Sequence, residues 1–349
     1  MQLRAHRFVA LAGLALGLGG CFGAPRYEGP PSGHFDGHAF ENQVAFEPRG
    51  VADILRWQLA GDAVAWPDWA NVARPPPPPG QVTSGVRITF VNHATVLVQM
   101  AGVNILTDPV WADRIGPVSW IGPSRHKAPG IAFAELPHID LGVLSHNHYD
   151  HLDVATLRRL SDRDAPLVLA GLGSRALLVE AGVGHAEDMD WWQSRAIGDV
   201  KVTFTPAQHW SRRGLGDDFA ELWGGFYFAA GETRVFFAGD TASGPHFAQI
   251  ADRLGPPTVA LLPIGAYLPT WFMRSQHIGP REAVAAHRAL GARTSIAIHW
   301  GTFDLADEGM YQPAGELMLA RRAAALPSDS FVVLEHGEQW QSARSIGAR

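Results

Sequence analysis

The chain has 349 residues, of which 46% are hydrophobic and 18% are charged. This balance excludes a disordered chain, a collagen-like repeat and a polytopic membrane protein. The length allows one large α/β domain or two small ones, with a sizeable buried core. The net charge is -6 and the sequence has no run of Lys or Arg, so nucleic acid is excluded as an expected partner.

The N-terminus has the pattern of a bacterial secretion signal. Two arginines precede the apolar stretch 8–18, which is too short to form a stable membrane-spanning helix. The next residues, 18–21 (LGGC), resemble the lipobox of bacterial lipoproteins, whose cysteine is lipidated and becomes the first residue of the mature chain. Because Cys21 is the only cysteine, we predict a signal peptide at 1–20 and lipidation at Cys21. The alternative is an ordinary signal peptide with an incidental cysteine.

Residues 21–85 are predicted to form a tether and N-terminal extension. Residues 22–50 are rich in Gly and Pro and have no clear period, which indicates a tether. Residues 51–70 contain three tryptophans and predict a short helix and a turn that pack on the main domain, with contact to a bilayer as the alternative. The prolines at 75–79 predict a stiff polyproline spacer.

The main domain is predicted to span 86–349. Apolar runs predict strands at 86–91, 95–100, 103–107, 141–145, 200–205, 224–229, 234–238, 259–263, 295–299 and 331–334. Asp153 is placed to cap a helix that runs to Leu160, and Pro280 is placed to begin a helix that Gly291 ends. Strands interleaved with helices favour an α/β sandwich in which helices cover two packed sheets.

A cluster of histidines follows the predicted strand at 141–145. The segment His146-Asn147-His148-Tyr149-Asp150-His151 holds three imidazoles and one carboxylate in six residues. Alternate residues of a loop point to the same side, and imidazole with carboxylate suits Zn²⁺ or a similar ion. We therefore predict a metal site with room for two cations; the alternative is a solvated histidine-rich loop.

Three further candidate ligands follow apolar runs downstream: His209, Asp240 and His299. The combined pattern, HxHxDH followed by H, D and H, resembles the metallo-β-lactamase superfamily from about Val86 to Phe303. This resemblance implies an αββα sandwich of two mixed sheets. It also implies one metal on His146, His148 and His209, and a second on Asp150, His151 and His299, with Asp240 bridging both. Asp108 resembles the superfamily's early aspartate that supports a ligand; the alternative is a turn residue before proline.

Blocks beyond the ligands give a closer likeness. Examples are Ser145–Asp153 (SHNHYDHLD), Leu222-Trp223-Gly224, Gln276-His277 and Ala297–Phe303 (AIHWGTF). In order along the chain, they resemble the N-acylphosphatidylethanolamine phospholipase D family. The resemblance implies hydrolysis of the headgroup-side P–O bond, giving phosphatidate and N-acylethanolamine. Animal members of that family lack a lipobox, so the cellular setting differs here.

The same resemblance implies roles for the residues around the metals. Asp240 holds the metals together, Asp150 orients the nucleophile, and His277 donates a proton or hydrogen bond near the phosphate; the alternative for His277 is a structural role in its loop. The remaining candidates are predicted to contact substrate: Gln276, Tyr267, Trp271, Phe272 and Met273. Core packing is an equal alternative for the last three. His93 and His287 are expected to be structural, and His34, His38 and His336 to lie on the surface.

Two other functions stay open at this point. One is a metallo-hydrolase of a lactone, a β-lactam or a non-lipid phosphodiester. The other is an envelope lipoprotein that binds lipid without turnover. Two Zn²⁺ ions are expected, although iron or manganese suits many of the same ligands. The N-terminus predicts a lipid anchor in the outer membrane, facing the periplasm, and only the family resemblance suggests a homodimer.

Overall fold

A computed structural model of the protein describes residues 23–73 and 75–342. The predicted signal peptide and Cys21 lie outside the described residues. Within the described ranges, no helix combines the length and the apolar character that crossing a bilayer requires.

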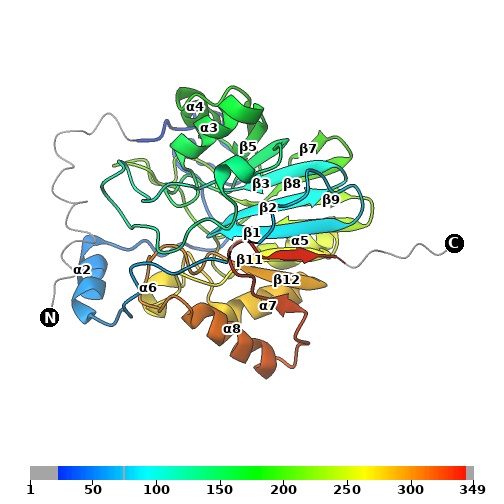
Figure 1. Ribbon diagram of the computed structural model, residues 1–349. Helices are drawn as coiled ribbons and strands as arrows, with labels where there is room; N and C mark the ends of the chain where they lie inside the picture. The colour runs from blue at the N-terminus through cyan, green and yellow to red at the C-terminus, as the bar shows by residue number, and fades with distance from the viewer. Residues whose placement is uncertain (1–22, 74, 343–349) are drawn as a thin grey trace.

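The first half of the main domain forms a seven-stranded sheet with the order β14-β1-β2-β3-β4-β5-β6 (Figure 1). Antiparallel pairs join β14, β1, β2 and β3, and parallel pairs join β3 through β6. Its strands are β1 (Val86–Asn92), β2 (Thr95–Met100), β3 (Val103–Thr107), β4 (Leu141–Leu144), β5 (Leu167–Gly171), β6 (Ala186–Met189) and β14 (Gln339–Gln341).

The second half forms another seven-stranded sheet with the order β13-β12-β11-β10-β9-β8-β7. Parallel pairs join β10 through β13, and antiparallel pairs join β7 through β10. Its strands are β7 (Ser194–Ile197), β8 (Val200–Thr205), β9 (Gly225–Ala230), β10 (Thr233–Phe237), β11 (Val259–Pro263), β12 (Thr294–Ile298) and β13 (Phe331–Val332). Both sheets are therefore mixed.

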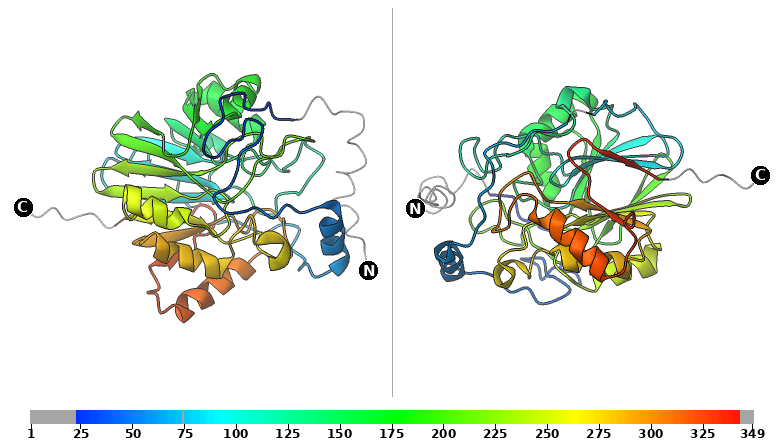
Figure 2. Two further views of the ribbon diagram at one scale, coloured as in Figure 1. Left: turned by 180° about the vertical axis from the view of Figure 1, so that it is seen from behind. Right: turned by 60° about the horizontal axis from the view of Figure 1, so that its bottom comes forward.

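Helices cover the outer face of each sheet. Helices α3 (Val154–Asp164) and α4 (Ser174–Glu180) lie above the first sheet in Figure 1, and α7 (Pro280–Ala289) and α8 (Gln312–Ala323) lie below the second. Helix α5 (His246–Leu254) packs beside α7. Two helices, α2 (Val51–Ala60) and α6 (Thr270–Met273), lie side by side at one end of the sandwich in all three views (Figure 2). A short 3-10 turn, η2, spans Phe133–Glu135.

The core lies between the two sheets and consists of aliphatic and aromatic side chains from both of them. Strands that are buried along their whole length, such as β4 and β11, come from continuous apolar runs, because both faces of such a strand are covered. The predicted αββα sandwich is confirmed. Asp153 caps α3 as expected, because its side chain accepts hydrogen bonds from the backbone N–H groups of Ala155 (3.1 Å) and Thr156 (3.3 Å).

The prediction that residues 22–50 form a free tether is wrong for the part that the structure describes. Phe35 and Phe40 are buried in the main core, and the backbone N–H of Phe40 donates to the carbonyl of Phe219 at 2.9 Å. The proline segment that follows also lies against the domain, because Gln99 donates to the carbonyl of Pro79 at 2.8 Å. The N-terminal extension, residues 23–85, is therefore part of the folded unit.

Candidate metal centre

The predicted ligands all lie in loops that directly follow strands of the two sheets. His146 to His151 follow β4, His209 follows β8, Asp240 follows β10 and His299 follows β12. Strands β8, β10 and β12 are alternate strands of the second sheet, with β9 and β11 between them, and β4 belongs to the first sheet. The ends of these strands bring the ligands together in one cluster, although His146 and His299 lie 153 positions apart in the chain (299 - 146).

The first part of the cluster consists of His146, His148 and His209. Nε2 of His146 lies 2.8 Å from Nδ1 of His148, and Nε2 of His209 lies 3.3 Å from the same atom. One nitrogen from each ring lies within 4.8 Å of the others, which is close enough for all three to bind one cation. These are the three residues that the family resemblance assigns to one metal.

The second part of the cluster surrounds the carboxylates of Asp150 and Asp240. Oδ2 of Asp150 lies 3.5 Å from Nε2 of both His151 and His299. Oδ2 of Asp240 lies 3.2 Å from the same two nitrogens and 3.9 Å from Nε2 of His209. Asp240 is therefore the carboxylate that contacts both parts of the cluster, the position that a bridging ligand requires.

Asp108 lies behind the cluster and orients it. Its Oδ2 accepts hydrogen bonds from Nδ1 of His151 and from Oγ of Ser145, both at 2.6 Å. Its Oδ1 accepts from the backbone N–H of Ser145 at 2.8 Å. A carboxylate on the far nitrogen of an imidazole fixes the tautomer that leaves Nε2 free for a metal. The structure therefore gives Asp108 the supporting position that its resemblance implied.

The backbone around the cluster is held in uncommon conformations. Asp108, His93 and His299 have positive φ values of 35°, 43° and 59°, a region that costs a non-glycine residue about 1–3 kcal/mol. Gly239, immediately before Asp240, packs so closely on Ser145 that a Cβ would lie 2.4 Å from the serine Cβ. Glycine at this position lets the β4 and β10 loops approach each other.

Burial sets the charge of the imidazoles that lie near His148. Burial lowers the pKa of His148 to about 4 and lowers the pKa values of His146 and His209 well below the usual range. For Asp240, burial acts to raise the pKa, but the neighbouring His151 and His299 outweigh burial and lower it well below the ordinary value. Neutral imidazoles beside an ionised carboxylate are the forms that bind metal.

The donor set fits divalent metal ions. Several buried ligand atoms have no hydrogen-bond partner within the described ranges: Nε2 of His148, His151 and His299, and Oδ1 of Asp240. Buried polar atoms without partners are costly, so their presence among the predicted ligands indicates a site built for cations. The set of imidazole and carboxylate ligands suits zinc, iron or manganese.

His93 belongs to this centre, although we expected a purely structural role for it. Its Nε2 lies 3.0 Å from Oδ2 of Asp150, and its ring centroid lies 4.0 Å from that of His299. Its carbonyl accepts a 2.7 Å hydrogen bond from the backbone N–H of His299. A histidine in the turn between β1 and β2, 57 residues before Asp150, gives no local signal of this contact.

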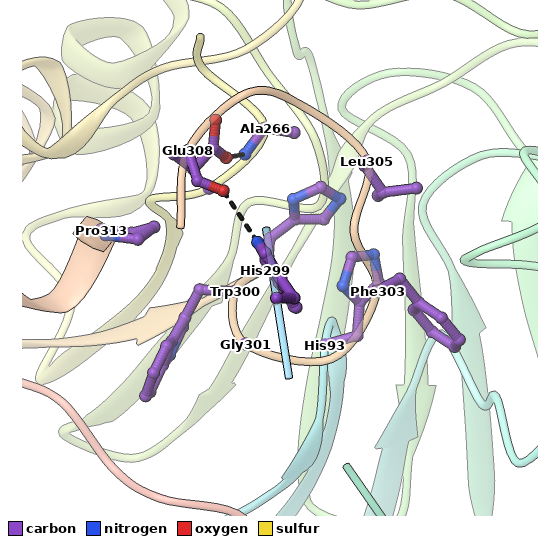
Figure 3. Close-up of a pocket in the computed structure, with 11 residues that line it drawn as sticks. His93, Ala266, His299, Trp300, Gly301, Phe303, Leu305, Glu308 and Pro313 are labelled. Carbon is purple, nitrogen blue, oxygen red and sulfur yellow. Dashed lines mark hydrogen bonds between the residues drawn. The ribbon is translucent and has the colours of Figure 1, made fainter. Parts of the chain in front are cut away.

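His93 and His299 also border a small pocket (Figure 3). The pocket is bounded on the other sides by groups that include Trp300, Phe303 and Glu308. The Glu308 carboxylate accepts hydrogen bonds from the backbone N–H groups of Ala266 and Leu268. These bonds hold the loop after β11, which leads to His277, against the loop after β12.

His277 lies beside the metal ligands. Its Nδ1 is 3.7 Å from Oδ2 of Asp240, and its ring centroid is 5.3 Å from that of His209. The carbonyl of the neighbouring Gln276 accepts a 2.8 Å hydrogen bond from Nδ1 of His209, whereas the Gln276 side chain contacts the sulfur of Met273. Gln276 therefore supports a ligand through its backbone.

The aromatic segment before His277 is mostly packed inside the protein. Phe272 and Met273 are buried with Trp57 of α2 in one apolar cluster, and Trp271 lies partly exposed at its edge. Tyr267 is buried, and Gly279 packs closely against its ring. Core packing, the alternative that the sequence left open, describes Phe272 and Met273; Trp271 is the member of this group that the surface can reach.

The N-terminal extension also contacts the centre directly. The Asn42 side chain donates to the carbonyl of His209 at 2.6 Å and accepts from its N–H at 3.0 Å. The Gln208 side chain makes a matching pair of hydrogen bonds with the backbone of Val44, at 2.8 and 3.2 Å. The extension therefore fixes the loop that carries His209, and no sequence pattern predicts this contact.

Of two other histidines, His336 differs from its predicted position and His287 agrees with its predicted role. His336, predicted on the surface, is buried: its ring nitrogens contact the Ala128 carbonyl (2.8 Å) and Oγ1 of Thr302 (3.1 Å). Paired polar groups explain how a histidine so near the C-terminus is kept inside. His287 is structural as expected, with Nδ1 2.8 Å from Oγ of Ser295.

Comparison with known proteins agrees with this centre. The family described as "Beta-lactamase superfamily domain" matches residues 103–300. The N-acyl-phosphatidylethanolamine-hydrolyzing phospholipase D 1 of Caenorhabditis elegans is 39% identical over 274 residues, which cover 74% of this chain and 76% of the relative. A UPF0173 metal-dependent hydrolase of Rubrobacter xylanophilus is 30% identical, over 64% of this chain and 85% of its own.

Solved structures support the fold. Igni18, described as a novel metallo hydrolase from Ignicoccus hospitalis, superposes with a TM-score of 0.57 at 20% identity, covering 74% of this chain and 99% of its own. The two-sheet sandwich, the cluster at its strand ends and the family match over 103–300 lead to one conclusion. The chain belongs to the β-lactamase superfamily and is a metal-dependent hydrolase with the metallo-β-lactamase fold.

Proposed function

We propose that the protein is a zinc-dependent phosphodiesterase of phospholipase D type, which hydrolyses N-acylphosphatidylethanolamine-like phospholipids. The observation that carries this proposal is the 39% identity to a relative named for that reaction, which extends over about three quarters of both chains. The metal ligands alone support only a metallo-hydrolase, because many hydrolases share them. The phospholipid substrate therefore rests on the relative.

The proposed reaction needs two divalent ions on the ligands described above. When bound, such ions supply Lewis acidity and make hydroxide available at neutral pH. Asp240 contacts both groups of ligands, and Asp150 lies beside His93, His151 and His299. These two carboxylates fix the relative positions of the groups that meet the phosphate.

His277 is placed to act on the substrate itself. It lies beside Asp240 but outside the group of His146, His148 and His209. Burial lowers the pKa of His277 to about 4, so at neutral pH the ring is uncharged and has one N–H to offer. We assign this N–H as a hydrogen-bond donor to the phosphate, where charge builds up as the headgroup-side P–O bond breaks. Water adds to phosphorus, and the leaving N-acylethanolamine oxygen takes up a proton.

The reaction is tested by mass spectrometry of its products. The metal-loaded protein is incubated with N-acylphosphatidylethanolamine in mixed micelles, with and without a chelator. We expect phosphatidate and N-acylethanolamine in equal amounts, and neither product with the chelator. Diacylglycerol or free fatty acid would instead assign another bond. No turnover by a fully metal-loaded protein would remove the phospholipid substrate and leave a metallo-hydrolase of a lactone, a β-lactam or another phosphodiester.

We also propose that the protein works at the cell envelope, anchored through lipidated Cys21 in the outer membrane and facing the periplasm. The support is the lipobox-like sequence LGGC at 18–21. Cys21→Ser should release the protein from the membrane fraction, and retention at the wild-type level would refute the lipid anchor. The homodimer that the family resemblance suggests is tested separately by the mass of the purified protein in light scattering.

A further inference from the structure

Helix α2 exposes an unusual face to solvent. Val51, Leu55 and Leu59 are spaced four residues apart, so they form one stripe along the helix. All three are exposed, Leu55 by 56% and Leu59 by 84%, and Ile54 beside them is exposed as well. A helix on a protein surface normally turns its aliphatic stripe inward. An exposed aliphatic stripe indicates a surface that contacts something apolar.

The opposite side of α2 fixes the helix firmly in place. Trp57 is buried, its ring centroid lies 4.8 Å from that of Phe272 in α6, and its Nε1 donates to the Asp307 carboxylate at 2.9 Å. Arg49, just before the helix, donates to the carbonyls of Trp271 and Phe272. The apolar stripe is therefore a rigid feature of the surface.

The helix lies close to the metal centre. Helix α6 packs against Trp57 on one side, and the segment that follows α6 leads to Gln276, whose carbonyl holds the ring of His209. Helices α2 and α6 lie together at one end of the molecule in every view (Figures 1 and 2). Helix α2 is thus joined to the segment that supports the ligands through α6.

One further observation concerns the same side of the molecule. The connection between β3 and β4 extends toward the side on which α2 lies (Figures 1 and 2). This connection carries Trp120, a large apolar side chain that is 66% exposed.

We propose that the exposed stripe of α2 (Val51, Ile54, Leu55 and Leu59) docks on the surface of a phospholipid bilayer. This inference rests on the proposed function, since a phospholipid substrate has to be met at a bilayer. Helix α2 carries one acidic residue, Asp53, and one basic residue, Arg56. The contact is therefore apolar, and it does not depend on anionic lipid. It would hold the metal centre against the substrate even without an acyl anchor.

The test measures vesicle binding by the mature chain from residue 21 with Cys21→Ser, so that neither the predicted signal peptide nor an acyl chain contributes. Vesicles of phosphatidylcholine and phosphatidylethanolamine, without any N-acylated lipid, are separated by flotation. We expect Leu55→Glu combined with Leu59→Glu to lower the vesicle affinity at least tenfold. Leu319→Glu on α8, which is 60% exposed on another helix, is the matched control and should bind like the parent. The unfolding temperature checks that all variants fold.

Because these vesicles contain no substrate, the binding result stands whether or not the proposed hydrolysis is correct. If the reaction is confirmed, the α2 variant should lose activity on vesicles but keep it on a short-chain substrate dispersed as monomers. Equal vesicle binding by parent and α2 variant would overturn the proposal. So would binding that requires anionic lipid and disappears in salt. A parent that is dimeric, with a monomeric α2 variant, would assign the stripe to a second copy of the chain instead.

Discussion

The strand-end loops of the sandwich and the N-terminal extension both hold His209, but they do so by different physical means. The loops supply ligand side chains from the ends of buried strands. The extension supplies Asn42, whose side chain binds the backbone of His209 through two hydrogen bonds of 2.6 and 3.0 Å. Ligand chemistry needs particular residue types at particular spacings, so the loops carry a motif. Backbone support needs only one amide in the right place, so the extension carries none.

The two regions also differ in how they are built into the core. The sandwich buries continuous apolar strands such as β4 and β11. The extension is held by a few large side chains, chiefly Phe35 and Phe40, whose ring centroids lie 4.6 Å apart. A region without periodic structure can therefore still belong to the folded unit. Substitutions in the two regions should therefore affect different properties, either ligand chemistry or the stability of the fold.

The largest effect is expected from removing the carboxylate that contacts both groups of ligands. Asp240→Asn should abolish binding of at least one metal ion and lower turnover at least about a thousandfold, because the metals supply several kcal/mol of transition-state stabilisation. Metal content by mass spectrometry and product formation are the measurements. Asp252→Asn, on the exposed side of α5, is the control. Full metal content in Asp240→Asn would show that Asp240 is no ligand.

His277 should separate substrate chemistry from metal binding. His277→Ala should lower turnover by about 10²–10³, the usual cost of losing a hydrogen-bond donor to developing charge. The metal content should stay unchanged, because His277 lies beside the ligands without being among the seven assigned here. Loss of metal together with activity would make His277 a ligand and refute the role proposed for it.

Phe40 tests whether the extension belongs to the cooperative fold. Phe40→Ala should lower the free energy of unfolding by about 3–5 kcal/mol, the usual cost of removing a buried phenylalanine from a packed core. The measurement is chemical denaturation. Val44→Ala, at an exposed position of the same segment, should change stability little. If Phe40→Ala also changed little, the extension would be a tether after all, as its composition indicates.

Much of the sandwich could be predicted because buried strands and metal ligands leave local patterns. The ranges of β8 and β11 were predictable to the residue, since β8 alternates apolar and polar residues (VKVTFT) and β11 is apolar along its length (VALLP). Strands β6 and β7 were missed: their sequences, AEDM and SRAI, are partly polar and lie at sheet edges. Strand β5 was missed as well, although its sequence, LVLAG, is apolar and mostly buried. Strand β14 was missed because it is defined by its pairing with β1. In that pairing Arg87 lies opposite Gln341, 254 positions later in the chain (341 - 87).

The residues of the candidate site also fall into two groups, those that a sequence pattern predicts and those that it does not. The seven ligands follow from a motif and from strand ends, and the structure brings all seven together. His93 and Asn42 could not be found from the sequence, because each contacts the centre through a pairing with a distant residue. His336 was misjudged for the same reason: a histidine near the C-terminus gives no sign that Ala128 and Thr302 will bury it.

Asn42 gives the direct test of support from the extension. Asn42→Ala should lower metal affinity about 10–100-fold, as is typical when a residue that orients a ligand is lost. Competition with a chromophoric chelator measures this affinity without relying on turnover. The neighbouring Gln43→Ala is the control, since Gln43 contacts only the Gln249 side chain near the surface. Unchanged metal affinity in Asn42→Ala would mean that the strand-end loops alone hold His209.

The smallest expected effect concerns acid stability and the buried His336. Burial lowers the pKa of His336 to about 3, whereas an unfolded histidine titrates near 6.5. Below pH 6.5 this histidine binds a proton in the unfolded chain but not in the folded chain. The free energy of unfolding therefore falls as the pH falls from 6.5 toward 3. From pH 7.5 to 5.5 this one group should cost about 1.4 kcal/mol.

His336→Asn should remove that part of the pH dependence, whatever its effect on stability at neutral pH. The measurement is the difference in unfolding free energy between pH 7.5 and 5.5, for the parent and the variant. The contributions of the metal ligands are common to both proteins, so they cancel in the comparison. The exposed His185→Asn should retain the parental loss on acidification. If His336→Asn loses as much stability on acidification as the parent, the His336 ring is protonated in the folded protein. Water would then reach the ring through an opening of the connection to β14. That outcome would contradict the buried position of His336.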